Sequence, residues 1–207
     1  MTDSYGLLGS GAQADEAEDF VYPERAAFRA VSSGFLHDRA GLIDIATSDP
    51  AFTGVPVVAA VGAPGLRRQL VAEWGGKLFR TIVAKSAWVS RSATIGSGAI
   101  ISPHCVISTR VTVGQHVLLN LGCSVSHESV VGSYVTISPG AVVAGRCHIG
   151  DGVFIGAGAV VSDGVTIASG VVVGAGAVVV ADIELPGVYI GVPAKRLRNQ
   201  EGWLHAI

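Results

Sequence analysis

The chain has few charged side chains, few aromatic side chains and no long uninterrupted apolar run. Charged residues make up 14% and aromatic residues 6% of its 207 residues, although 49% are hydrophobic. The longest nearly apolar stretch, residues 170–181, is interrupted by glycine and is too short to span a bilayer. We therefore expect no membrane partner. No charged segment followed by an apolar one opens the chain, so we also expect no signal peptide and a cytoplasmic protein.

Basic blocks and cysteines are also scarce. The net charge is −2 and the sequence has no basic block, which argues against nucleic acid as a partner. A metal or redox set is one interpretation of the three cysteines, Cys105, Cys123 and Cys147. Each of them, however, falls where other repeats of the chain carry Ala or Val. We expect them to be reduced thiols in a hydrophobic core.

Between Val83 and Val179 a branched aliphatic residue recurs at every sixth position. A helix cannot use this period, because successive side chains would be rotated by about 240°. The positions are Val83, Val89, Ile95, Ile101, Ile107, Val113, Leu119, Val125, Val131, Ile137, Val143, Ile149, Ile155, Val161, Ile167, Val173 and Val179.

The residue two positions before each aliphatic, from Val89 on, is small or β-branched. Positions two apart share a face of a strand, so each hexad supplies one bulky and one small inward residue before a turn. This pattern predicts an all-β left-handed parallel β-helix with three hexads in each coil. A β-sandwich or another solenoid is the alternative, but a sandwich does not explain the period.

Outward positions of the predicted β-helix form three faces. Two are mostly apolar, represented by Trp88 and Val142 on one and by Ile100 and Leu118 on the other, and the third is polar. Long apolar faces on the outside of a protein need to be covered. We expect a closed homo-oligomer, most simply a homotrimer, with the N-terminal residues covering part of the remainder.

Residues 1–82 show a different pattern, in which short apolar strands alternate with helical segments. The first strand runs into Gly9-Ser-Gly11-Ala-Gln13, a glycine turn that opens a helix, as in sites that bind phosphate. An ordinary strand-turn-helix remains an alternative, and no acidic residue follows where NAD would require one. A second glycine turn at Gly62 precedes a helix from about Leu66 to Trp74.

These segments predict a small Rossmann-like α/β domain with a parallel sheet and a ligand beside the glycine turns. We expect Arg67 and Arg68 on the solvated side of the second helix. The domain boundaries predicted from the change in pattern are 1–82 for the α/β domain, 83–185 for the β-helix and 186–207 for a C-terminal extension that contains the basic pair Lys195 and Arg196.

His127 differs from the other histidines. It falls at a corner of the β-helix, it is followed by Glu128, and Gly145 lies eighteen residues later, directly over it on the next coil. A glycine there leaves a backbone N–H beside an imidazole, which suits a general base next to an oxyanion donor. A hydrogen-bonded corner histidine without a catalytic role is equally compatible with the spacing.

The remaining histidines favour surface positions. His104 and His116 fall at turns and His148 on the polar face, so we expect all three to be solvated. Metal-dependent hydration by a β-helix trimer would need histidines that converge. His116 and His148 lie 11 and 21 residues from His127, on other corners or faces, so we expect no metal.

The sequence resembles the bacterial acetyltransferases of nucleotide-activated amino sugars related to PglD and NeuD. The resemblance covers nearly the whole chain. Its most specific parts are residues 120–132 with the His127-Glu128 pair, Ala144-Gly145, and the closing segment Gly191-Val-Pro-Ala-Lys195. Members of that family are trimers that use acetyl-CoA, which they bind between neighbouring β-helices.

The resemblance implies a role for each matching position. His127 corresponds to the general base, Glu128 to its polarising partner and Gly145 to the oxyanion donor. Two positions depart from the family pattern, since Gln13 and Thr136 stand where relatives carry histidines. The other implied contacts are Asn120, Thr136, Gly9, Gly11, Gln13 and Gly62 for the nucleotide sugar, and Lys195 and Arg196 for the coenzyme phosphates.

The function implied is acetyl-CoA-dependent N-acetylation of a nucleotide-linked 4-amino-deoxysugar by direct transfer. No cysteine faces outward as an acyl carrier, so we expect a ternary complex. Two alternatives remain open: O-acetylation of a sialic-acid-like sugar, and a non-catalytic trimer that binds sugar nucleotides. The second is suggested by Gln13 and Thr136, whereas the retained His127, Glu128 and Gly145 argue against it.

Overall fold

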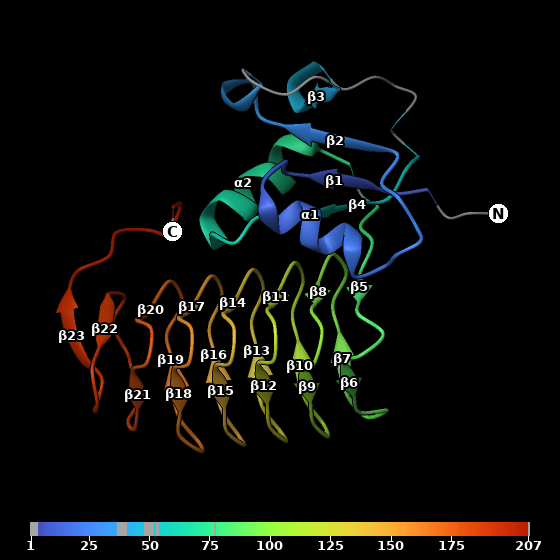
Figure 1. The fold of residues 1–207 in the computed structure, drawn as a ribbon. Helices are drawn as coiled ribbons and strands as arrows, with labels where there is room; N and C mark the ends of the chain where they lie inside the picture. The colour runs from blue at the N-terminus through green and yellow to red at the C-terminus, as the bar shows by residue number, and fades with distance from the viewer. Residues whose placement is uncertain (1–3, 37–40, 48–51, 53, 77, 207) are drawn as a thin grey trace.

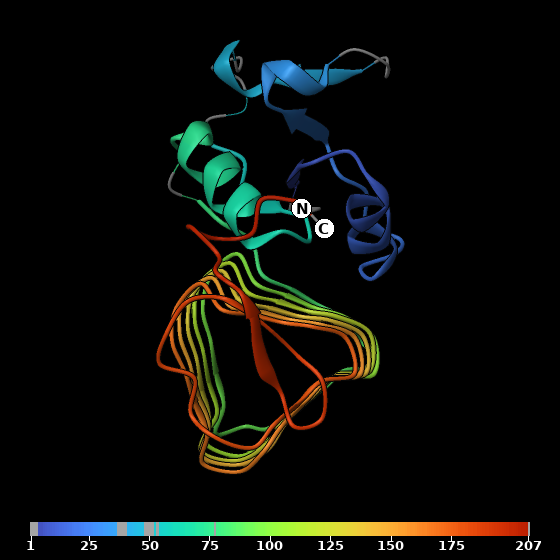
Figure 2. The same cartoon turned by 90° about the vertical axis from the view of Figure 1, so that its left-hand side faces the viewer.

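The computed structural model describes residues 4–36, 41–47, 52, 54–76 and 78–206. A small α/β layer formed by the N-terminal residues lies along one side of a long parallel β-helix (Figure 1). Viewed along its axis, the β-helix is a three-sided prism with the α/β layer above one side (Figure 2). None of the helices in the described ranges is long or apolar enough to cross a membrane.

The α/β layer contains a four-stranded parallel sheet in the order β3-β2-β1-β4. Chain order reverses at β1, between β2 and β4, which is where open parallel sheets bind ligands. The predicted strands and helices are present. The elements are β1 (Gly6–Leu8), α1 (Ala12–Asp19), β2 (Phe28–Val31), η1 (Ser33–Phe35), β3 (Leu42–Asp44), η2 (Ile45–Thr47), β4 (Val57–Ala59) and α2 (Pro64–Trp74).

The β-helix has three faces, and strands eighteen residues apart pair in parallel, as with Thr112 and Val130. The domain-facing face contains β5 (Ile82–Val83), β8 (Ile100–Ile101), β11 (Leu118–Leu119), β14 (Thr136–Ile137), β17 (Phe154–Ile155), β20 (Val172–Val173), β22 (Val188–Ile190) and β23 (Lys195–Arg198). The open apolar face contains β6 (Trp88–Val89), β9 (Val106–Ile107), β12 (Ser124–Val125), β15 (Val142–Val143), β18 (Val160–Val161) and β21 (Val178–Val179). The polar face contains β7 (Thr94–Ile95), β10 (Thr112–Val113), β13 (Val130–Val131), β16 (His148–Ile149) and β19 (Thr166–Ile167).

Three edges join these faces, and we name each by one residue on it. The Asn120 edge holds the turns between the domain-facing and open apolar faces. The His127 edge holds the turns between the open apolar and polar faces. The His116 edge holds the turns between the polar and domain-facing faces. Only the His127 edge does not border the face that carries the α/β layer.

The predicted sixfold register forms the core of the β-helix. Every aliphatic of the register from Ile101 to Val179 is buried, as are Cys105, Cys123 and Cys147, which are free thiols. Burying a Val or Ile side chain contributes about 1.5–3 kcal/mol. The first member, Val83, keeps the register because it aligns with Ile101, but it is 40% exposed because no earlier coil covers it. Its neighbour Ile82 points outward and is buried against the α/β layer.

The α/β layer covers one of the two apolar faces. Ile100 and Leu118, both 1% exposed, share a hydrophobic cluster with Tyr5 and Leu7. The open apolar face has no such cover in a single chain, and Trp88 on it is 55% exposed. After β23 the chain turns back toward α2, where the Leu204 carbonyl accepts a hydrogen bond of 2.8 Å from the Gly65 N–H.

Candidate active site

His127 occupies the turn between β12 and β13 on the His127 edge. Its side chain is 44% exposed and that of Glu128 is 42% exposed. Both neighbouring coils hold the turn in place: the Glu128 N–H donates to the Thr109 carbonyl at 3.0 Å, and the Arg146 N–H donates to the His127 carbonyl at 2.8 Å. The imidazole is therefore accessible but stands on a fixed backbone.

Gly145 lies against the imidazole, as the spacing of eighteen predicts. A β-carbon added at Gly145 would lie 2.6 Å from Cε1 and 2.8 Å from Nε2 of His127, and 2.8 Å from Oδ1 of Asp163. Within the described part of the chain, the Gly145 N–H donates to no acceptor. The structure thus places a glycine with a free backbone N–H beside the Nε2 edge of the ring. This N–H can donate a hydrogen bond that stabilises negative charge developing on an oxygen.

Glu128 lies on the opposite side of the ring. One carboxylate oxygen, Oε2, is 3.3 Å from His127 Nδ1, and the other, Oε1, accepts a hydrogen bond of 3.0 Å from Arg110. The Arg110 hydrogen bond, followed by the one with His127, holds the pKa of Glu128 below its usual value. Glu128 is therefore an anion that can orient the imidazole with its Nδ1 proton toward the carboxylate.

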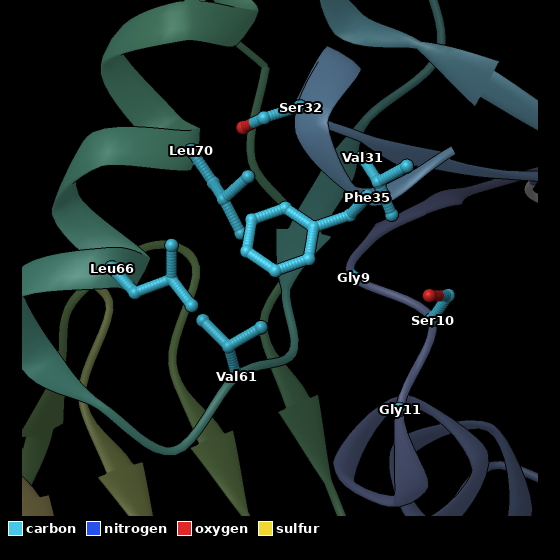
Figure 3. A pocket seen from close by; sticks show the side chains of 9 residues that line it. All are labelled: Gly9, Ser10, Gly11, Val31, Ser32, Phe35, Val61, Leu66 and Leu70. Carbon is cyan, nitrogen blue, oxygen red and sulfur yellow. The ribbon is translucent and has the colours of Figure 1, made fainter. Parts of the chain in front are cut away.

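A cavity of about 270 Å³ lies at the carboxyl ends of the strands in the α/β layer (Figure 3). It reaches the predicted glycine turn at Gly9 and Gly11. Its other walls are mostly apolar, and the Phe35 ring stands among Val31, Val61, Leu66 and Leu70. Phe35 is 61% exposed, which is unusual for a large aromatic side chain and suits a surface on which a planar ligand stacks.

Gly9 has a backbone φ of +123°, and a β-carbon there would lie 3.0 Å from both the Ala60 carbonyl oxygen and Val61 Cγ1. The turn therefore requires glycine at this position. Gln13 does not line the cavity. Its side chain lies on α1, where its amide donates a hydrogen bond of 3.2 Å to Glu16.

Gly62 also does not line the cavity, and it takes part in a contact between the two layers. Its carbonyl accepts hydrogen bonds from Arg67 at 3.1 Å and from the Thr136 hydroxyl at 2.6 Å. Arg67 is 1% exposed, so the expectation that it is solvated is wrong. Its guanidinium also donates to the carbonyls of Val61, His116, Tyr134 and Val135 and to the Thr136 hydroxyl.

Comparison with known proteins agrees with this fold. Residues 146–181 match the family described as bacterial transferase hexapeptide (six repeats). No curated protein matches the sequence. The structure superposes on PerB from Caulobacter crescentus, solved in complex with CoA and GDP-perosamine, with a TM-score of 0.85 and 28% identity over 93% of this chain and 96% of that one.

The acetyltransferase domain of PglB from Neisseria gonorrhoeae, solved with acetyl coenzyme A, has a TM-score of 0.81 and 27% identity over 95% of this chain and 100% of that one. WeeI from Acinetobacter baumannii, at 24% identity and a TM-score of 0.81 over 94% of this chain and 99% of that one, shares the fold. The matches to PerB and PglB extend over both layers. The chain is similar, over nearly its whole length, to hexapeptide-repeat nucleotide-sugar acetyltransferases. Its β-helix is of the left-handed form, as predicted.

Asn120 and Thr136 lie away from the imidazole in this acetyltransferase. Asn120 lies on the Asn120 edge, which the open apolar face separates from the His127 edge. Its Oδ1 accepts a hydrogen bond of 2.9 Å from the Leu121 N–H. Thr136 is 2% exposed beneath α2, where its hydroxyl is used by Arg67 and Gly62. One chain therefore does not bring Asn120 or Thr136 to His127.

Lys195 and Arg196 lie on β23, which pairs antiparallel with β22 at the C-terminal end of the β-helix. Both side chains are exposed, and Arg196 also donates to the Pro186 carbonyl at 2.5 Å. They stand several coils from His127. Among the described residues, no three His, Cys, Asp or Glu side chains form a group suited to a metal ion.

His116 lies within a row of aromatic rings under α2, so the expectation that it is solvated is wrong. It is 2% exposed, it stacks on Tyr134 with ring centroids 4.9 Å apart, and its ring is perpendicular to that of Phe79 with centroids 4.5 Å apart. The predicted turn position is correct, but the α/β layer covers it. Burial, followed by the charge of Arg67, lowers the pKa of His116 to about 4.

This burial predicts acid sensitivity. In the unfolded chain a histidine has a pKa of about 6.5, so below that pH the unfolded state binds more protons than the folded state. We expect stability to be complete above about pH 6.5 and to fall by on the order of 2 kcal/mol as the pH approaches 4. Urea unfolding at fixed protein concentration at pH 7.5 and pH 5 measures this.

The matched variants are His116→Asn and His148→Asn. Asparagine tolerates the backbone φ of +54° at residue 116, and His148 is exposed. We expect His116→Asn to lose less stability between the two pH values than the unmodified protein does, and His148→Asn to lose the same amount. An equal loss in all three would show that another group causes the sensitivity.

Proposed function

We propose that this protein transfers the acetyl group of acetyl-CoA directly to the amino group of a nucleotide-linked 4-amino-deoxysugar, with His127 as the general base. The observation that carries the proposal is the contact of the imidazole with two groups: its Nε2 edge meets Gly145 and its Nδ1 meets Glu128. PerB, described as a GDP-perosamine N-acetyltransferase, supports this substrate class.

The residues account for each step of the transfer. The sugar amine attacks the thioester carbonyl carbon, and the oxygen gains negative charge that the Gly145 N–H can stabilise. His127 Nε2 accepts the proton that the nitrogen loses as the new C–N bond forms. When the C–S bond breaks, the same proton can pass to the departing thiolate, which yields the acetamido sugar and free CoA.

The cavity in the α/β layer is the proposed nucleotide site. Phosphates would lie at the Gly9 to Gly11 turn, where the start of α1 presents unpaired N–H groups, and the base would stack on Phe35. Of the substrate contacts implied by family resemblance, Gly9 and Gly11 fit this site. Gln13, Gly62 and Thr136 lie outside the cavity, so we assign them no direct contact with substrate.

The nucleotide site and His127 lie on different sides of a single chain. The α/β layer stands on the domain-facing face, whereas His127 is on the edge that does not border that face. The exposed open apolar face lies between the Asn120 and His127 edges. A homotrimer that packs through this face would place the Asn120 edge of one subunit beside the His127 edge of the next, with acetyl-CoA between them and its phosphates near Lys195 and Arg196.

Charge on the open apolar face should separate the subunits. We expect Val142→Lys to reduce the mass in light scattering from three times 21.1 kDa to that of one chain and to abolish acetyl transfer. Val130→Lys is the matched control, because Val130 is 41% exposed on the polar face and Val142 is 38% exposed on the open apolar face. A monomeric unmodified protein would contradict the trimer.

Release of the CoA thiol tests the proposed activity. Acetyl-CoA is incubated with a panel of nucleotide-linked amino sugars, with the same sugars lacking the amine, and with sialic-acid-like sugars. We expect thiol release only with the amino sugars, together with an acetamide product. Release with hydroxyl acceptors alone would indicate O-acetylation, and sugar-nucleotide binding without release would indicate a non-catalytic trimer.

A further inference from the structure

Three successive turns on the His127 edge carry a side chain where the backbone favours glycine. Arg110, Glu128 and Arg146 have φ values of 56°, 61° and 55°, and Gly164 follows at the equivalent position. On the Asn120 edge the equivalent residues after His104 are all glycine: Gly122, Gly140, Gly158 and Gly176. A left-handed backbone costs free energy for a residue with a β-carbon. Side chains at these positions therefore indicate a functional role that offsets this cost.

The stacking of these turns places Arg110 directly beside Glu128. Its Nη2 lies 3.0 Å and its Nε 3.3 Å from the same carboxylate oxygen, Oε1. The second oxygen, Oε2, faces His127 Nδ1 at 3.3 Å. Arg146, on the other side of Glu128, pairs with Asp163 instead. Glu128 is therefore shared between Arg110 and His127, with one oxygen for each.

This sharing matters because the carboxylate is otherwise free to turn. The Glu128 side chain is 42% exposed on a surface turn and needs a second contact to remain beside the ring. The neutral imidazole of histidine in water prefers its proton on Nε2, which leaves no lone pair there for a base. A carboxylate held at Nδ1 reverses that preference, because it accepts the Nδ1 proton in a hydrogen bond and frees Nε2.

We propose that Arg110 is a positioning residue, which anchors Oε1 of Glu128 so that Oε2 stays on His127 Nδ1 and Nε2 remains unprotonated toward Gly145. The proposal rests on the proposed function in taking Nε2 as the base. Arg110 makes no contact with the reacting atoms in this arrangement. Its effect should therefore appear in turnover and in the state of the imidazole, and not in substrate affinity.

Kinetics separate this role from substrate binding. We expect Arg110→Met to lower kcat by roughly tenfold, with the KM values for acetyl-CoA and the nucleotide sugar within about twofold. Arg110→Lys keeps one charged donor and should recover part of kcat. Arg91→Met is the matched control: it removes the same charge from an exposed residue of the same edge, two coils from His127, and should match the unmodified protein. A raised KM with kcat unchanged would overturn the proposal, because Arg110 would then bind substrate.

Nitrogen NMR of the histidine side chains tests the same point without acetyl transfer. With His127 assigned by its loss in His127→Gln, we expect the neutral ring to carry its proton on Nδ1 in the unmodified protein and in Arg91→Met. Arg110→Met should shift the population toward the Nε2 proton. An unchanged tautomer in Arg110→Met would overturn the positioning role. Because this readout needs no acceptor sugar, it remains decisive even if no nucleotide sugar in the panel is acetylated.

Discussion

Replacing His127 with alanine is expected to lower kcat by on the order of 10²–10⁴-fold while the oligomeric state stays unchanged. The amine loses a proton as it attacks the thioester, and the variant has no group placed to accept it. The side chain is 44% exposed, so its removal leaves no buried cavity. The backbone of the turn is also retained, because the Arg146 N–H binds the His127 carbonyl and not the ring.

The matched control is His148→Ala, which removes an exposed histidine from β16 on the polar face, one coil further along. We expect it to retain full activity. A second signature identifies the base: the deficit of His127→Ala should shrink at high pH, where more of the sugar amine is already neutral. If His127→Ala kept its turnover within about threefold at neutral pH, His127 would have no role in proton transfer.

Much of the fold and the central contact of the site follow from counting along the chain. A period of six places each aliphatic inward, and three hexads in a coil place residue 145 over residue 127 whatever the other side chains are. The contact between Gly145 and His127 is therefore predictable from number alone. At the first coil the count still gives the register, since Val83 aligns with Ile101, but Val83 is 40% exposed because no earlier repeat covers it.

Residues at the junction of the two layers could not be placed in the same way. Arg67 follows Leu66 on α2, and helical periodicity predicts only that it faces away from the Leu66 stripe. Its burial depends on the carbonyls of His116 and Tyr134, which the docking of α2 brings to it. His116 is buried for the same reason. Neither the helical period nor the hexad period contains information on how one unit sits on the other.

Phe35 was also missed as a candidate ligand contact. It follows Ser32-Ser33-Gly34 after a buried strand, and a polar segment at the end of a parallel strand is where a binding residue is expected. This polar segment is a weaker signal than the acidic residue that marks a dinucleotide site. The walls of the cavity around Phe35 come from residues at or after the ends of β2 and β4 and from α2, so the cavity depends on how these elements pack.

Replacing Gly145 with alanine is expected to reduce kcat by about 10²-fold through a single methyl group. The φ of Gly145 is not positive, so alanine does not strain the backbone. The new β-carbon would instead lie 2.6 Å from His127 Cε1 and 2.8 Å from Asp163 Oδ1, closer than such atoms can approach. Both side chains are partly exposed and can turn outward, so the fold should persist while Nε2 leaves its position beside the Gly145 N–H.

Gly54→Ala serves as the control, because a β-carbon at Gly54 meets nothing within 4 Å. We expect Gly54→Ala to match the unmodified protein in turnover. Gly54→Ala and Gly145→Ala should both match the unmodified protein in light-scattering mass and thermal unfolding. Combining Gly145→Ala with His127→Ala should lower kcat little beyond the larger single effect, because the methyl group acts by displacing a ring that the double variant no longer has. Additive losses would show that the methyl group blocks the thioester independently of His127. Unchanged turnover in Gly145→Ala would show that the contact between Gly145 and His127 has no role in catalysis.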